Sequence, residues 1–185
     1  MALSLVYETH SLTQDNEAGI VTGWLPGKLS AEGRRLATEL GRRRRHDGIG
    51  AVFCSDLNRA VETARIAFEG SDIPLFFDWR LRECNYGDLN GAPVARVASM
   101  RRACIDRPFP GGQSYADTLV NTRAFLADAQ RTFDGRRICV IAHVASKWAL
   151  DVLVLGKALE VLVEQDFGWQ EGWEYVVESS HLTSR

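Results

Sequence analysis

The sequence lacks several features that would assign it to a secreted or membrane-bound class. No two of its four cysteines stand in C-x-x-C spacing, and the N-terminus has no basic start followed by a long apolar run. The longest apolar stretches, such as 148–155, are interrupted by a charge and are too short to span a bilayer. These absences predict reduced thiols, a cytoplasmic location and no membrane partner.

A strong net charge is also absent. The chain carries 22 basic and 24 acidic residues, a formal charge of −2, so any anion-binding site must come from a local cluster of basic residues. The basic run 42–45 looks like a nucleic-acid patch in isolation, but it falls near the end of a predicted helix, where cations oppose the negative end of the helix dipole. We therefore expect no nucleic-acid partner.

What the chain does have is enough apolar sequence to bury a core. It has 185 residues, of which 45% are apolar and 25% charged, and it shows no repeat and no low-complexity linker. Such a composition predicts one globular domain over 1–185.

Strand-like and helix-like segments alternate along this domain. Strands are expected at about 5–7, 51–56, 73–78, 136–143 and 174–177. Helices are expected at 30–45, capped by Ser30, after a cap at Asp56, and at 93–103, 115–132, 145–155 and 159–164. This alternation predicts an α/β fold, a three-layer α/β/α sandwich with a mainly parallel central sheet.

Polar residues follow three of the predicted strands. His10, Ser55 with Asp56, and His143 stand at strand ends, and parallel α/β sheets bind ligands at the carboxyl ends of their strands. Arg59 falls in the first turn of the next helix, where a guanidinium and the helix N-terminus both favour a phosphate. A surface arginine beside an ordinary helix cap is the alternative interpretation.

Six segments, in order, resemble the histidine phosphatase superfamily, also called the phosphoglycerate mutase-like family. The segments are THSLTQDNEAG, TGWLPGKLSAEG, SDLNRAVETA, LRECNYGDLNG, FPGGQS and VIAHVAS. The first is similar to the family pattern R-H-G-x-T-x-x-N and places His10 on the phosphorylated histidine. The others place Arg59 on a phosphate-binding arginine, Glu83 on the general acid and His143 on the second pocket histidine.

The resemblance implies a metal-independent phosphatase without a cofactor, acting on a small phosphomonoester. The catalytic residues would be His10, Glu83 and His143: His10 attacks phosphorus, and Glu83 protonates the leaving group and later activates water. The remaining residues expected to bind phosphate or substrate are Ser11, Asn16, Thr22, Gly23, Arg59, Arg82 and Lys147.

The chain departs from the family pattern around both histidines. Thr9 replaces the arginine before the nucleophile, Ser11 the following glycine and Leu12 the frequent glutamate, while Ala142 and Val144 replace glycines beside the second histidine. A lost charged hydrogen bond is worth about 1.5–3 kcal/mol, or one to two orders of magnitude in binding or rate.

Three other basic residues could supply the missing charge. Lys147 lies one helical turn beyond His143, and Arg80 and Arg82 flank the approach to Glu83. We expect Arg80 to be exposed to solvent instead.

Other functions are left open by these departures. A phosphoglycerate mutase-type phosphotransferase is one, although Cys84 and Asn85 stand where such mutases have an arginine and a histidine. The others are a phosphate-binding module and an acid–base enzyme acting on a substrate without phosphate. A homodimer and the identity of the substrate are also open.

Two aromatic residues and one thiol near these motifs are expected to be structural. Trp169 and Trp173 could stack on a substrate ring, but aromatic residues beside a closing strand more often complete the core. Cys84 follows Glu83, and we expect it to serve packing rather than redox chemistry.

Overall fold

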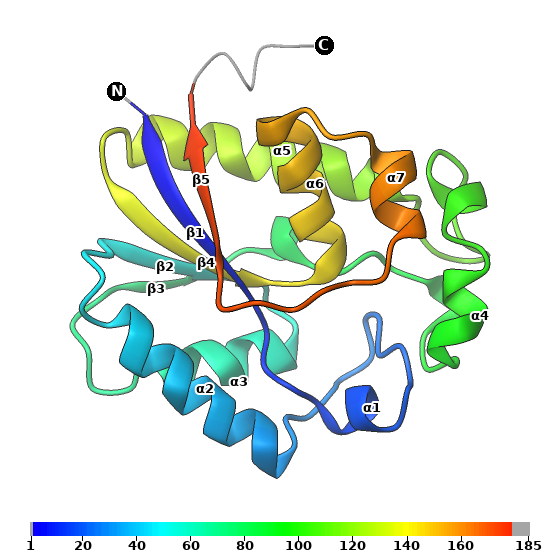
Figure 1. Cartoon of the computed structure of the whole chain (residues 1–185), viewed down its shortest axis with the longest axis horizontal. Coiled ribbons are helices and arrows are strands. Elements are labelled where there is room, and N and C mark those ends of the chain that lie inside the picture. Colours follow the sequence, from blue (N-terminus) through cyan, green and yellow to red (C-terminus); the bar gives the residue numbers. More distant parts are fainter. Residues whose placement is uncertain (1, 179–185) are drawn as a thin grey trace.

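The computed structural model describes residues 2–178, which contain a five-stranded sheet in the order β3-β2-β4-β1-β5 (Figure 1). Its strands are β1 (Leu3–Thr9), β2 (Ala51–Cys54), β3 (Leu75–Phe77), β4 (Arg137–Ala142) and β5 (Trp173–Val177). Four of them are parallel, and β5 runs antiparallel to β1 at one edge. The predicted mainly parallel sheet is confirmed.

Helices cover both faces of this sheet, with α2 and α3 on one side and α5 and α6 on the other (Figure 1). Their bounds are α1 (Gln14–Glu17), α2 (Ala31–Arg44), α3 (Asn58–Ala67), α4 (Val94–Ala98), α5 (Tyr115–Thr132), α6 (Val144–Leu155) and α7 (Leu159–Glu164), with 3₁₀ turns η1 (Trp79–Leu81), η2 (Gly87–Leu89) and η3 (Arg102–Cys104). None of the helices within residues 2–178 is long and apolar enough to cross a bilayer.

The alternation of side chains along β1 joins the layers. Leu5 and Tyr7 enter the core cluster that contains Phe125 of α5, whereas Val6 enters the opposite cluster with Leu40 of α2. Successive residues of a strand point to opposite faces, and a fully buried side chain of this size contributes about 1.5–3 kcal/mol. Strand β1 is therefore packed from both faces of the sheet, which fixes the position of its carboxyl end.

The helix caps were predicted with mixed success. Ser30 caps α2, and its hydroxyl accepts a hydrogen bond from the Gly33 amide. The cap assigned to Asp56 is wrong. The amide of Leu57 donates to the Ser55 hydroxyl, and the Asp56 carboxylate instead binds Arg82, at 2.6 Å.

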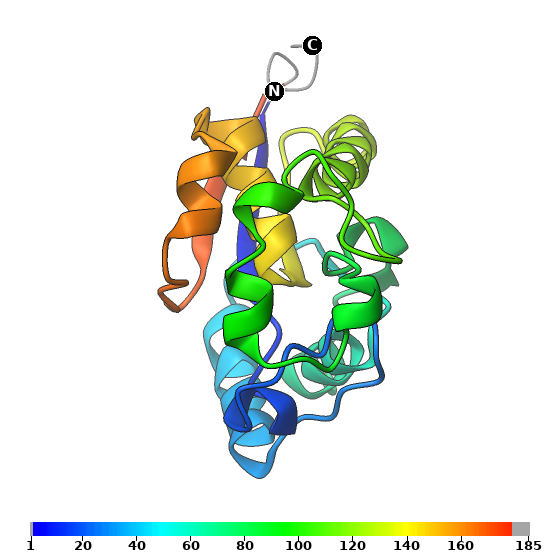
Figure 2. The same cartoon turned by 90° about the vertical axis from the view of Figure 1, so that its right-hand side faces the viewer.

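Two loops also differ from the sequence prediction. The helix expected over 93–103 ends at Ala98, and the chain continues as turns through η3. The short helix α1 was not predicted; it forms because Thr13 and Asn16 exchange hydrogen bonds in a capping box. Figure 2 shows α1, α4 and the neighbouring turns in front of the carboxyl end of the sheet.

The basic run at the end of α2 serves internal contacts. Arg44 forms a 2.7 Å ion pair with the buried Glu8 of β1, and Arg45 donates to the carbonyl of Ala67 at the end of α3. Its position at a helix C-terminus is as predicted. These arginines tie α2 to the sheet and to α3.

Candidate active site

Two neighbouring strands bring the two predicted histidines together. Parallel β1 and β4 pair Thr9 with Ala142, and the amide of His10 donates to the Ala142 carbonyl at 2.8 Å. His10 and His143 follow these two strands directly, and the centres of their rings lie 5.1 Å apart. The predicted juxtaposition is present.

Arg59 reaches the same place from the first turn of α3. Its Nε donates to His10 Nε2 at 3.2 Å, and its Nη2 donates to the Gly23 carbonyl at 2.9 Å. Since His10 Nδ1 donates to the Ser11 carbonyl at 2.7 Å, Nε2 is unprotonated in this arrangement, and its lone pair accepts the hydrogen bond from Arg59. His10 is thus oriented with an unprotonated nitrogen toward the arginine.

Glu83 is fixed beside this pair by backbone amides. Its Oε1 accepts hydrogen bonds from Cys84 N at 2.8 Å and from Ala145 N at 3.3 Å. Ala145 lies in the first turn of α6, directly after His143 and Val144, so the N-terminus of this helix positions the carboxylate next to the second histidine. Burial raises the pKa of Glu83, and the amides and Arg59 oppose that shift only in part.

Burial also determines the protonation of the histidines. Loss of solvent, followed by the positive charge of Arg59, lowers the pKa of His10 from 6.5 to about 3. The pKa of His143 is lowered well below its usual value by burial, by Arg59 and by His10. Both imidazoles are therefore neutral near pH 7, as a nucleophile or proton acceptor requires.

Several hydrogen-bonding atoms around His10 have no partner within residues 2–178. They are Nη1 of Arg59 and both ring nitrogens of His143. Arg59 is 2% exposed and His143 is fully buried. Most buried polar groups in proteins are hydrogen-bonded, so three unpaired atoms beside one imidazole indicate a site for a polar or anionic group.

The loops around the cluster contain four of the other predicted binding residues. Gly23 has a φ of 56° and a carbonyl bound to Arg59; a side chain there would place its first carbon 1.8 Å from Asn90 Oδ1. Thr22 donates to Asp15, Asn16 accepts from the Thr13 amide, and the Ser11 hydroxyl donates to the Gly33 carbonyl. These polar side chains stabilise the loops.

The structure does not bring Lys147 and Arg82 into the cluster. Lys147 forms a 2.7 Å ion pair with Asp151 and lies 5.2 Å from the Trp173 ring centre. Arg82 binds Asp56 and stacks on Trp24. Each charge has a carboxylate partner outside the cluster, and a contact of either residue with phosphate stays a prediction. The solvent exposure expected for Arg80 is also wrong, since only 21% of its side chain is exposed and it binds Asp78 and Asp128.

Thr63 and Asn90 hold the cluster together but were not singled out in the sequence. The Thr63 hydroxyl accepts from the Ser11 amide at 2.9 Å and donates to the Arg59 carbonyl at 2.7 Å. Asn90 Oδ1 accepts from the amides of Trp24 and Tyr86. Both residues belong to segments that resemble the family, Thr63 to SDLNRAVETA and Asn90 to LRECNYGDLNG. Their positions in these segments could have identified them as site residues.

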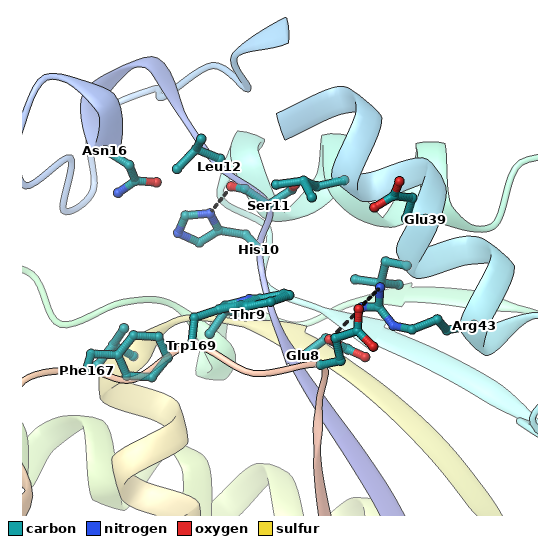
Figure 3. Close-up of a pocket in the computed structure, with 14 residues that line it drawn as sticks. Glu8, Thr9, His10, Ser11, Leu12, Asn16, Glu39, Arg43, Phe167 and Trp169 are labelled. Atoms are coloured by element: carbon teal, nitrogen blue, oxygen red, sulfur yellow. Dashed lines mark hydrogen bonds and ion pairs between the residues drawn. The ribbon is translucent and has the colours of Figure 1, made fainter. Parts of the chain in front are cut away.

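A cavity of about 360 Å³, here called the chamber, adjoins His10 (Figure 3). It extends along the end of β1, past Thr9, to α2 and to the loop before β5. Thr9 is 8% exposed. Arg59 is the one basic side chain that hydrogen-bonds to His10 in the described part of the chain, so the charge that Thr9 lacks is not replaced there.

The two tryptophans of the loop and strand near β5 differ in burial. Trp173 packs against Tyr7, with ring centres 6.3 Å apart, as expected for a core residue. Trp169 is 57% exposed and lines the chamber, so its assignment to the core is wrong. Cys84 is buried, as predicted, and burial raises the pKa of its thiol well above the usual range.

The lowered pKa of His10 makes a prediction for stability. The unfolded chain protonates this histidine near pH 6.5 and the folded chain only near pH 3, so folding loses stability as pH falls through this window. Relative to a His10→Asn variant, the wild type should lose about 2 kcal/mol of unfolding free energy between about pH 7 and pH 5, measured by urea denaturation.

The exposed His46 offers the matched control for this measurement. A His46→Asn variant should follow the wild type at both pH values. A His10→Asn variant whose stability runs parallel to the wild type would show that His10 is not held in its neutral form.

Comparison with known proteins places this geometry in a family. Residues 9–173 match the family model of the histidine phosphatase superfamily (branch 1). The chain is 31% identical to a 2,3-bisphosphoglycerate-dependent phosphoglycerate mutase of Latilactobacillus sakei, over 79% of this chain and 81% of that protein. Phosphoglycerate mutase 1 of Saccharomyces cerevisiae is 39% identical over 50% of this chain, but the match spans only 40% of the yeast protein.

Solved structures show the same fold. Bacillus stearothermophilus YhfR superposes with a TM-score of 0.81 at 23% identity, over 95% of this chain and 91% of that one. A putative alpha-ribazole-5'-P phosphatase from Escherichia coli superposes with a TM-score of 0.79 at 20% identity, over 100% of both chains. The six sequence segments, the paired histidines at the sheet edge and these matches lead to one conclusion: the chain belongs to the histidine phosphatase superfamily.

Proposed function

We propose that this chain is a metal-independent phosphatase that hydrolyses a small phosphomonoester through a phosphohistidine on His10. The observation that carries the proposal is the neutral His10, whose Nε2 lies among buried, unpaired atoms of Arg59 and His143. A phosphoryl group bonded to Nε2 would offer oxygen acceptors to these atoms. The matched family and the named phosphatases among its solved relatives support this chemistry.

In the first half-reaction, the Arg59 Nε–H turns from His10 Nε2 to a phosphoryl oxygen. The lone pair of Nε2 then forms a bond to phosphorus while the bond from phosphorus to the alcohol oxygen breaks. Glu83, whose pKa is raised by burial, gives its proton to the departing oxygen. The backbone amides of Cys84 and Ala145 then stabilise the carboxylate that this transfer leaves. The products of this step are the alcohol and phosphohistidine.

In the second half-reaction, the Glu83 carboxylate takes a proton from water, and the water oxygen attacks phosphorus. The bond from phosphorus to His10 breaks, so inorganic phosphate leaves and both residues return to their starting states. Arg59 stabilises charge on the phosphoryl oxygens throughout. The negative charge of a bound phosphate also favours protonation of His143, which opposes the effect of burial on its pKa.

A mutase is the second candidate, because curated relatives of this chain carry that name. A mutase must bind a second anionic group of its substrate. Cys84 is buried in the core, and the Asn85 side chain accepts hydrogen bonds from the Gly87 amide and from Asn90. Neither residue supplies a cation for that purpose, which favours the phosphatase.

The test of the proposed function is to trap the intermediate. Brief mixing with a ³²P-labelled phosphomonoester should label the wild type with acid-labile, base-stable phosphate, and His10→Ala should stay unlabelled. Turnover should continue in EDTA. Activity that disappears with the chelator and returns with zinc or magnesium would contradict the mechanism, and phosphate transferred to an acceptor rather than released would identify a mutase.

The raised pKa of Glu83 predicts a pH profile. Because Glu83 must be protonated to act as the acid, kcat/KM for an alkyl phosphate should fall as pH rises through that pKa. Glu83→Gln should remove this limb and lower kcat/KM, which reports the first half-reaction alone, for an alkyl phosphate by about 10²–10⁴-fold. The loss should be much smaller for 4-nitrophenyl phosphate, whose leaving group needs no proton.

An exposed carboxylate on α7 gives the control for this variant. Glu160→Gln should leave both substrates unaffected, since Glu160 is exposed on α7 and does not line the chamber. Equal losses on the alkyl and nitrophenyl substrates in Glu83→Gln would assign Glu83 a role other than general acid.

Thr9 predicts an increase in activity. The residue lines the chamber beside His10, which leaves room for a longer side chain. Thr9→Arg should raise kcat/KM for 4-nitrophenyl phosphate about tenfold or more, the effect of one charge-assisted contact in the transition state. Thr9→Gln, long but uncharged, is the control. A folded Thr9→Arg variant without any gain would show that charge at this position does not limit the reaction.

A further inference from the structure

The chamber beside His10 has mostly apolar walls. Leu12, Leu36, Leu40 and Val144 line it from the loop after β1, from α2 and from α6, and Phe167 and Trp169 close it from the loop before β5. Its volume of about 360 Å³ falls in the range of small-molecule sites. An apolar group of a ligand would therefore leave water and contact carbon on several sides.

The charged residues at the chamber's other end already have partners. Glu8 is bound by Arg44 at 2.7 Å and by Arg43 at 3.6 Å. Arg43, the one basic residue lining the chamber in the described part of the chain, also lies 3.5 Å from Glu171. Glu39, also in the lining, pairs with Arg35. A carboxylate or second phosphate would therefore find no unpaired arginine or lysine in the described lining.

The aromatic end of the chamber lies toward the reacting nitrogen. In Figure 3, Asn16 and Phe167 are on the side of the His10 ring away from Ser11, which binds Nδ1, whereas Glu39 and Arg43 lie beyond Ser11. Val144 of the lining precedes Ala145, whose amide binds Glu83. The chamber wall is thus one residue from the amide that holds the proposed proton donor.

We propose that the Phe167–Trp169 end of the chamber binds the organic group of the substrate, and that this group is uncharged and apolar or aromatic. The assignment rests on the proposed phosphatase function. Once His10 attacks, the alcohol oxygen leaves on the side of phosphorus opposite Nε2 and receives its proton from Glu83. An apolar group attached to that oxygen then contacts Phe167 and Trp169. This contact helps to position the phosphate, which Thr9 cannot do because it carries no charge.

The test compares two primary alkyl phosphates of similar intrinsic reactivity, 3-phenylpropyl phosphate and glycerol 1-phosphate. The wild type should show at least about tenfold higher kcat/KM for the phenyl substrate. Trp169→Ala should reduce this preference about tenfold through KM, with little effect on glycerol 1-phosphate. Leu36→Trp, which fills the chamber from α2, should reduce it by a similar factor.

Trp79 provides a matched control for Trp169. The two side chains are 56% and 57% exposed, and only Trp169 lines the chamber, so Trp79→Ala should keep the wild-type preference. Binding of the product 3-phenylpropanol, measured by calorimetry, should weaken in Trp169→Ala and not in Trp79→Ala; this readout needs no catalysis.

Two results would overturn the assignment while the proposed function stands: equal kcat/KM for the two substrates, or a Trp169→Ala variant as selective as the wild type. Failure of the proposed function gives a different result, in which neither substrate releases phosphate. In that case 3-phenylpropanol binding that is the same in both tryptophan variants would also reject the chamber as an apolar site.

Discussion

The parallel pairing of β1 with β4 is the constraint on which the candidate site depends. The register that opposes Thr9 to Ala142, extended by the hydrogen bond from the His10 amide, places both histidines at the same level of the sheet edge. Both strands are buried between helices, and shifting the register by one residue would move every core side chain of β1 to the wrong face. The packing of the core therefore fixes the separation of 5.1 Å between the two ring centres.

Burial gives the acid and the nucleophile opposite pKa shifts from a single cause. Removing water disfavours whichever form carries charge, so the pKa of His10 falls and that of Glu83 rises. Both shifts favour the uncharged form, which the proposed nucleophile and the proposed acid each need. The same effect lowers the free energy of unfolding at low pH, because the histidines bind protons in the unfolded chain at pH values where they stay neutral in the folded chain.

Thr9 and the chamber place fewer binding contacts on the phosphate and more on the organic group of the proposed substrate. A charged contact next to the nucleophile would act on every phosphate ester alike, whereas an apolar wall at Trp169 acts only on substrates with a matching group. In the proposed reaction Arg59, which hydrogen-bonds to His10, would bind the phosphoryl group, and the Ala145 amide at the N-terminus of α6 holds Glu83. Replacing a charged contact with the phosphate by an apolar contact with the organic group would make the enzyme more selective among phosphate esters and less active on esters in general.

The sequence by itself determined most of the strands and helices, though not α1 or the end of α4, and it determined the order of the motifs. Periodic apolar residues predicted α2 and α5, and the Ser30 cap predicted the start of α2. Strands that end in histidine predicted the sheet edge where His10, Arg59, Glu83 and His143 meet. These features depend on residues close together in the sequence, so the sequence alone can show them. Tertiary structure decided what depends on distant partners. Lys147 and Arg82 are held by Asp151 and Asp56, Trp169 lines a chamber instead of the core, and Ala145 binds Glu83 through a backbone amide that no residue identity reveals. A long charged side chain can pair in several directions, and only the packed fold selects which carboxylate lies within reach.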